Sequence, residues 1–229
     1  CSISRPTHVL ITNVGKAHLE GFGGFEGVKK GKREMYTFAK NTNATVFINT
    51  DNEHLKEMLG GYTMIVSYGT GGSEDVSGLL KGDASYVWLA WKTQDNDQIY
   101  NIKSHITGNY NFENILSAIA VGIHFKVTAH DICEAVETYI PDNQRSQEIK
   151  VGSNHVILDA YNANPSSMEA ALTNFTNHFS GKRAVFLGDM FELGESAFAE
   201  HKRIAEIATS AGFDHVILVG PDFRKAASG

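Results

Sequence analysis

A histidine and a glutamate follow the first apolar stretch of the chain, where they could contact a ligand. His18 and Glu20 come shortly after residues 7–14, a run typical of a buried strand. Loops beyond the carboxyl ends of strands form the ligand crevice of open α/β sheets. No histidine or cysteine partner lies nearby at zinc-ligand spacing, so the pattern does not indicate zinc. His18 is therefore either another kind of ligand or a structural histidine, and Glu20 is better interpreted as a surface or supporting residue.

A basic segment downstream of this loop could complement phosphate groups. Residues 29–34 have the sequence Lys-Lys-Gly-Lys-Arg-Glu and lie within a predicted helix. Charge runs of this kind usually form a solvated helix face. The alternative is that these cations, Lys32 among them, lie near the ligand crevice and balance the charge of a nucleotide.

Polar side chains at three further places are candidates for ligand contact. Asn111 and Asn114 belong to the segment 108–114, which a turn and a helix N-cap would also explain. Arg145 lies in the polar stretch 143–146, where by itself it is a linker charge. Asp159 ends an apolar strand, and the helix cap that follows it does not account for a carboxylate there.

An acidic run in the last third of the chain could also bind a ligand. Residues 187–195 have the sequence Leu-Gly-Asp-Met-Phe-Glu-Leu-Gly-Glu, in which Asp189 and Glu192 are flanked by apolar residues, and His201 follows. An ordinary loop whose acids favour the positive end of a helix dipole would have the same composition.

Composition excludes several classes of protein. The 229 residues carry a net charge of −6, which argues against a nucleic-acid-binding protein with its usual basic face. The apolar runs are too short to span a bilayer, and no signal peptide is evident. Two cysteines cannot form a disulfide framework, so a reduced, cytoplasmic setting is the simplest expectation.

Short β-branched runs alternate with amphipathic stretches, which predicts an α/β fold with a largely parallel sheet. A polar stretch at 140–146 interrupts this pattern, and we place a domain boundary there, giving domains 1–146 and 147–229. Thr128 is a predicted N-cap, as is Asn164 before Pro165. The predicted strands are 7–14, 44–49, 62–67, 84–91, 98–103, 156–159, 184–187 and 215–219, and the predicted helices are 26–40, 52–59, 114–125, 129–139, 166–179 and 198–210.

In this order and spacing, the motifs resemble those of the Mur ligases, over essentially all 229 residues. The resemblance implies a partial central ATP-binding domain and a partial Rossmann-like C-terminal domain. It implies that His18 and a carbamylated Lys32 bind magnesium, since a carbamate supplies oxygen ligands suited to a hard cation. It further implies nucleotide contacts, which fall on Asn111, Asn114, Arg145 and Asp159. Tyr110 departs from the family pattern, which has a histidine there.

The segments 161–168 and 187–195 resemble the family member that adds D-alanyl-D-alanine to UDP-N-acetylmuramoyl-tripeptide in peptidoglycan synthesis. The implied reaction uses ATP and Mg²⁺ and passes through an acyl phosphate. Asp189 and Glu192 are then candidates for orienting the dipeptide or bracing the closed domain. The resemblance also implies a cytoplasmic, monomeric parent enzyme with no nucleic-acid partner and no membrane insertion.

Some family features are missing from these residues. The chain holds no Gly-x-x-Gly-Lys-[Thr/Ser] loop. We therefore expect a fragment of a longer enzyme that is inactive by itself and whose Lys32 keeps an unmodified amine of ordinary pKa. Two alternatives are another ATP-dependent amide ligase of this type, similar to folylpolyglutamate synthase, and a nucleotide-binding module without catalysis.

Overall fold

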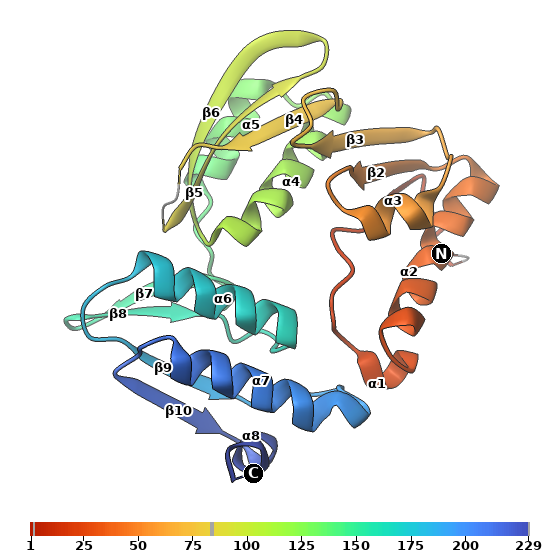
Figure 1. Ribbon diagram of the computed structural model, residues 1–229. Helices are drawn as coiled ribbons and strands as arrows, with labels where there is room; N and C mark the ends of the chain where they lie inside the picture. The colour runs from red at the N-terminus through yellow and green to blue at the C-terminus, as the bar shows by residue number, and fades with distance from the viewer. Residues whose placement is uncertain (2, 83–84, 229) are drawn as a thin grey trace. The chain divides into compact units, whose positions relative to one another are not determined.

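The computed structural model describes residues 1, 3–82 and 85–228 (Figure 1). The chain divides into two compact units. The first unit contains Cys1–Val14 and Glu26–Tyr139, and the second contains Gly15–Phe25 and Ile140–Gly229. The loop that carries His18 thus belongs to the second unit, although it lies between two segments of the first in sequence.

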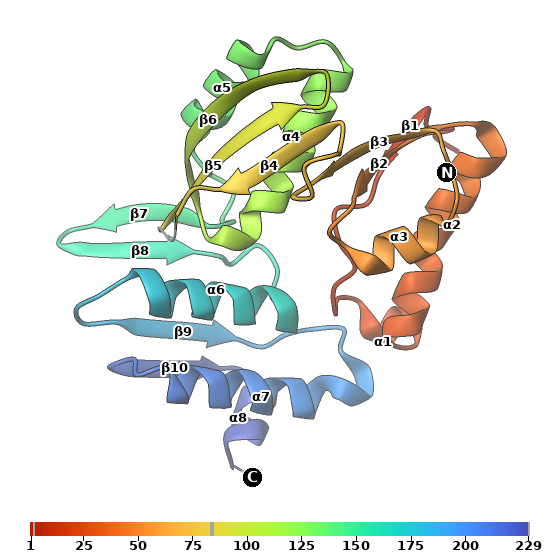
Figure 2. The same ribbon diagram turned by 45° about the horizontal axis from the view of Figure 1, so that its top comes forward.

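The first unit is built on a six-stranded sheet with the order β1-β2-β3-β4-β5-β6 (Figure 2). Strands β1 to β4 pair in parallel, and β5 and β6 continue the sheet in antiparallel pairing. The predicted α/β class with a mostly parallel sheet is confirmed. The strands are β1 (His8–Leu10), β2 (Thr45–Asn49), β3 (Ile65–Gly69), β4 (Val76–Leu80), β5 (Tyr86–Thr93) and β6 (Asn96–Thr107).

Two cores lie on opposite faces of this sheet because successive side chains of a strand point to opposite sides. On β2, Phe47 belongs to one core, whereas Val46 and Ile48 belong to the other. The first core is completed by α4 (Phe112–His124) and α5 (Ala129–Thr138), and the second by α2 (Phe25–Thr42) and α3 (Glu53–Leu59). A 3₁₀ turn, η1 (Asn109–Asn111), leads into α4.

The second unit holds two small sheets. An antiparallel pair joins β7 (Gln147–Val151) to β8 (Asn154–Leu158), and a parallel pair joins β9 (Ala184–Gly188) to β10 (His215–Val219). The remaining elements are α1 (Leu19–Phe22), α6 (Pro165–His178), the 3₁₀ turn η2 (Gly194–Ser196), α7 (Ala197–Ser210) and α8 (Pro221–Ser228).

The predicted N-cap residues mark where two helices begin. Thr128 accepts a hydrogen bond from the backbone N–H of Asp131, and Asn164 forms a capping box with Ser167, so both predicted N-caps are confirmed. The strand predicted over 7–14 is shorter than expected, since β1 ends at Leu10. Strands β4 and β7 were not predicted, and Ala84, where another strand was expected to begin, lies outside the described residues.

Within the described ranges, no helix combines the length and apolar character needed to cross a membrane.

Candidate functional site

Asn111 and Asn114 lie together where α4 begins in the first unit. The Asn111 side-chain amide donates to the carbonyl of Thr107 at 2.8 Å, and Asn114 Nδ2 donates to Asn111 Oδ1 at 3.0 Å. Asn111 occupies the N-cap position, but its side chain makes no capping hydrogen bond. A helix cap therefore does not explain why an amide stands here.

Gly108 permits the tight approach to these asparagines. Its φ of 87° lies in the region that favours glycine. A Cβ at this position would come within 2.3 Å of the ring of Tyr110, the residue that departs from the Mur ligase pattern. The tyrosine ring thus packs over the backbone turn that precedes η1.

Lys32 lies on α2 of the first unit, where its ammonium donates to the carbonyl of Asn13 at 2.6 Å. Desolvation by burial lowers its pKa below the ordinary value. The expectation that Lys32 keeps an ordinary pKa is therefore wrong, because the sequence did not reveal this burial. A lowered pKa increases the fraction of neutral amine, which is the form that reacts with carbon dioxide to give a carbamate.

The neighbouring cations of α2 pair with acids. Lys29, only 12% exposed, lies 3.5 Å from Glu26 and 3.6 Å from Glu57 of α3. Arg33 lies 3.9 Å from the same Glu57. These two side chains therefore join α2 to α3, and neither of them presents an isolated charge to a phosphate.

His18 and Glu192 meet in the second unit, 174 positions apart in sequence. Nδ1 of His18 contacts a carboxylate oxygen of Glu192, and the Glu192 carbonyl accepts the backbone N–H of Glu20 at 2.9 Å. Both His18 and Glu192 have positive φ, 58° and 61°, so each is held in a conformation that few residues adopt freely. The predicted metal residue and one predicted substrate residue are thus neighbours.

A second ion pair holds the loop that carries His18, and it was not predicted from the sequence. Lys16 Nζ lies 2.8 Å from Glu200, which also accepts from Arg203 at 2.9 Å. Burial alone would raise the pKa of Glu200, but the hydrogen bonds from Lys16 and Arg203 outweigh it and hold the pKa below its usual value. The one sequence signal for the role of Glu200 is that it is an acidic residue in the first turn of α7.

Asp159 and Arg145 come together beside β8. The backbone N–H of Ser146 donates to Asp159 Oδ1 at 3.3 Å, and the Arg145 guanidinium carbon lies 3.9 Å from the centre of the Tyr161 ring. Asp159 lies at the surface, where partial desolvation raises its pKa, while the Ser146 N–H and the Arg145 charge oppose that rise. A carboxylate acceptor beside a guanidinium suits a ligand that carries both hydroxyl and phosphate groups.

Asp189 is placed differently from the other candidates. Its carboxylate is buried and accepts the backbone N–H groups of Asp222 at 3.0 Å and Phe223 at 2.8 Å, at the start of α8. His201, fully buried, accepts the N–H of Met190 through Nε2 and contacts the Ala197 carbonyl through Nδ1. Of the two roles predicted for Asp189, these contacts support bracing.

The predicted residues could hold magnesium only if Lys32 were carbamylated. Among the described residues, no group of three or more histidine, cysteine or acidic side chains could hold a metal ion. The Lys32 ammonium is a hydrogen-bond donor, whereas magnesium requires oxygen ligands. A carbamate on Lys32 would supply them.

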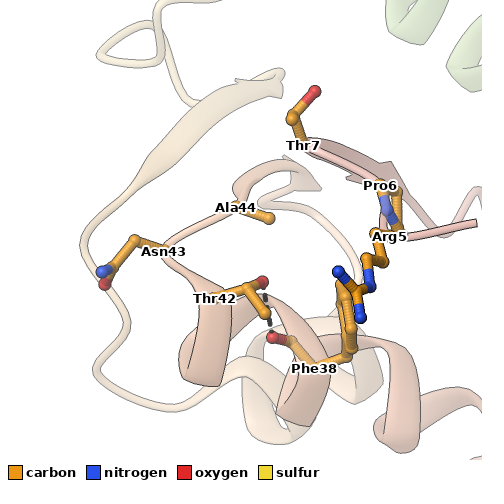
Figure 3. Close-up of a pocket in the computed structure, with 7 residues that line it drawn as sticks. All are labelled: Arg5, Pro6, Thr7, Phe38, Thr42, Asn43 and Ala44. Carbon is orange, nitrogen blue, oxygen red and sulfur yellow. Dashed lines mark hydrogen bonds between the residues drawn. The ribbon is translucent and has the colours of Figure 1, made fainter. Parts of the chain in front are cut away.

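A surface hollow in the first unit lies apart from these residues (Figure 3). Thr42 on its wall donates to the Phe38 carbonyl at 2.9 Å, which closes the last turn of α2. The hollow is lined by Arg5, Pro6, Thr7, Phe38, Thr42, Asn43 and Ala44. None of the predicted site residues is among them.

Both units match one family of α/β enzymes. Residues 1–122 match the Mur ligase middle domain, and residues 144–229 match the Mur ligase glutamate ligase domain. The chain belongs to the Mur ligase family.

Individual ligases of this family are similar to the chain over nearly its whole length. UDP-N-acetylmuramoyl-tripeptide–D-alanyl-D-alanine ligase of Bacillus subtilis (strain 168) is 29% identical over 95% of this chain and 47% of its own length. The crystal structure of MurF from Acinetobacter baumannii has a TM-score of 0.85 at 26% identity, covering 98% of this chain and 49% of its own. MurF ligase from Thermotoga maritima in complex with ADP has a TM-score of 0.82 at 22% identity, covering 98% and 51%. The chain therefore spans about half the length of the relatives it matches.

Proposed function

We propose that this chain provides the nucleotide-binding and ligase domains of an enzyme that adds D-alanyl-D-alanine to UDP-N-acetylmuramoyl-tripeptide. One observation carries the proposal. Both Mur ligase domains occur in order in this chain, and a ligase named for that reaction aligns with 95% of it. Peptidoglycan synthesis is then the process that the reaction serves.

The reaction has two steps. An oxygen of the tripeptide carboxylate attacks the γ-phosphorus of ATP, giving an acyl phosphate and ADP. The dipeptide amine then attacks the acyl carbon, loses a proton, and expels inorganic phosphate as the amide forms. The protein positions the reactants and balances their charge, since the phosphoryl group itself activates the carboxylate.

Four residues are proposed to hold the nucleotide. Asn111 and Asn114 would contact it from the first unit, and their mutual hydrogen bond fixes the direction in which each amide points. Asp159 would accept hydrogen bonds from the ribose hydroxyls, and Arg145 would contact phosphate oxygens. The Thermotoga maritima structure of the same fold contains ADP, which agrees with a nucleotide in this family.

His18 and a carbamylated Lys32 are proposed to hold Mg²⁺, which when bound neutralises phosphate charge. The lowered pKa of Lys32 supports carbamylation at that position. His18 must exchange its Glu192 contact for the metal ion, or bind it through Nε2 while Glu192 keeps Nδ1 and orients the ring. The second arrangement would leave the contact between His18 and Glu192 intact.

Glu192 is proposed to act near the dipeptide and Asp189 to brace the domain. The Glu192 side chain is 58% exposed, so its carboxylate can reach a ligand, whereas the Asp189 carboxylate is buried against α8. We also propose that the domain limit lies at residues 146/147, close to the division between the two compact units at Tyr139 and Ile140.

The test uses the longest product of the gene that encodes these residues. Phosphate release should require ATP, the UDP-linked tripeptide and D-alanyl-D-alanine together. Asp159→Asn should raise the KM for ATP at least about tenfold, the loss of one charged hydrogen-bond partner. Asp142→Asn, at an exposed position nearby, should leave that KM unchanged.

Two results would replace the proposal. Phosphate release that depends on glutamate and a folate would identify another amide ligase of this type. Nucleotide binding with no release under any combination of these substrates would identify a module without catalysis.

A further inference from the structure

Two histidines from distant parts of the first unit meet on one face of its sheet. His8 lies at the start of β1, and His124 is the last residue of α4. Their Nε2 atoms are 3.0 Å apart, and their ring centres are 5.0 Å apart, although 116 positions separate them in sequence. Neither residue has a part in the proposed ligase reaction.

Both rings are held in place by their surroundings. His8 packs against Phe125 with ring centres 4.9 Å apart, and the rings of His124 and Phe47 are nearly perpendicular, with centres 5.3 Å apart. The second nitrogen of His8, Nδ1, lies 2.9 Å from the hydroxyl of Thr7. A partner on the far nitrogen fixes the tautomer and the ring direction of a metal-binding histidine. Both rings are partly exposed, so solvent ions can reach them.

We propose that His8 and His124 form a two-imidazole site for a first-row divalent ion, preferably Ni²⁺ or Cu²⁺. With metal–nitrogen bonds of about 2.0–2.1 Å, two nitrogens this far apart subtend an angle of about 95° at the metal. Square-planar and octahedral ions place neighbouring ligands at about 90°, and Cu²⁺ and Ni²⁺ favour these geometries. Tetrahedral zinc would need the nitrogens to be about 3.3 Å apart.

The charges around the pair are consistent with such a site. Burial lowers the pKa of His124, and His8 and Lys126 lower it further against the opposing effect of Asp75. The lowered pKa favours the neutral His124 ring, which is the form that binds a metal ion. The negative charge of Asp75 favours a bound cation near His124, whereas the positive charge of Lys126 disfavours it.

Metal binding at this site would tie the first strand of the sheet to the end of α4. An ion that binds the folded chain and not the unfolded one raises the free energy of unfolding by an amount that grows with the logarithm of the ratio of free ion to Kd. Water molecules would complete the coordination of the ion.

The test is calorimetric titration of the 229-residue chain with Ni²⁺ at pH 7.5. A Cys1→Ser background is needed because the exposed Cys1 offers a thiol to the same ion. His8→Gln and His124→Gln should each weaken the binding at least about tenfold, since one of two ligands is lost. His130→Gln, at an exposed position of α5, and His215→Gln, at an exposed position of the other unit, should bind as the background does.

Equal affinity in all five proteins would overturn the proposal and leave the pair as a hydrogen bond between imidazoles. If a glutamine variant does not fold, electron paramagnetic resonance of the Cys1→Ser chain with one equivalent of Cu²⁺ decides. Hyperfine coupling to two imidazole nitrogens supports the site, and coupling to one or none contradicts it. Mg²⁺, which prefers oxygen ligands, should not compete.

Discussion

Asp189 and Glu192 stand three positions apart in one acidic run, yet the structure uses them in different ways. The Asp189 carboxylate is buried and accepts two backbone N–H groups at the start of α8. Glu192 is exposed, has a positive φ, and faces His18. Two acids of one short run therefore differ in burial: one holds the start of α8, and the other is exposed to solvent beside His18.

The largest expected effect comes from crowding the Asp189 carboxylate. Gly220 has a φ of 121°, and a Cβ there would lie 2.2 Å from Asp189. Gly220→Ala should therefore lower the free energy of unfolding by about 3 kcal/mol, through backbone strain and overpacking together. Urea denaturation measures it.

Gly212→Ala is the matched control, since its φ is 73° and no atom lies within 4 Å of the added Cβ. It should cost about 1 kcal/mol, from strain alone. Equal losses in the two variants would show that Asp189 does not fill the space beside Gly220.

Asp189→Ala should lower the free energy of unfolding by about 2 kcal/mol, because two partly buried N–H groups lose their acceptor. Glu195→Ala, in the same run but exposed, should change it by less than about 0.5 kcal/mol. Thermal or urea unfolding of both variants checks the difference. A loss as small as that of the control would mean that Asp189 does not cap α8.

Glu200 gives an intermediate case, a buried carboxylate that pairs with side-chain cations. Glu200→Gln should cost about 1 kcal/mol at pH 7, since Lys16 and Arg203 are partly exposed and regain water. The folded-state pKa of Glu200 lies below its ordinary value of 4.5. The stability it contributes is therefore present above that value and is lost as the pH falls through the folded pKa.

The measurement is urea unfolding of wild type and Glu200→Gln from pH 7 to pH 3. The two stabilities should converge as the pH falls, whereas Glu206→Gln, at an exposed position of α7, should track the wild type throughout. A constant gap at every pH would assign the cost to packing.

Glu192→Gln should have the smallest effect on stability, within about 0.5 kcal/mol, because both members of the His18 pair are more than half exposed. If Glu192 serves the ligand, the same variant should reduce ligase activity while the fold is unchanged. A loss of stability as large as that of Asp189→Ala would remove the distinction between the two residues.

Local signals predicted much of the fold. The helices α2, α4 and α7 have clear apolar periodicity, and Thr128 and Asn164 cap the helices they precede. Strand β4 follows a glycine-rich loop and is only five residues long, so its apolar residues gave no separate pattern. Strand β7 was not predicted, because Gln147, Glu148 and Lys150 make it polar.

The sequence predicted which residues belong to the candidate site, but it did not predict which of them contact one another. The sequence named His18 and Glu192 separately, but their pairing depends on a loop that belongs to the second unit. The Lys16–Glu200 contact spans 184 positions, and no local pattern indicates which acid a lysine will meet. Burial of Lys32 and Asp189 likewise depends on packing that the sequence alone does not give.

The proposed ligation through an acyl phosphate can be followed with an oxygen label. The tripeptide carboxylate is labelled with ¹⁸O, and the longest product of the gene is given ATP and D-alanyl-D-alanine. We predict that mass spectrometry finds one ¹⁸O in each released inorganic phosphate, because the carboxylate oxygen leaves with the phosphoryl group. Release of unlabelled phosphate during amide formation, or of labelled AMP, would show that no acyl phosphate forms.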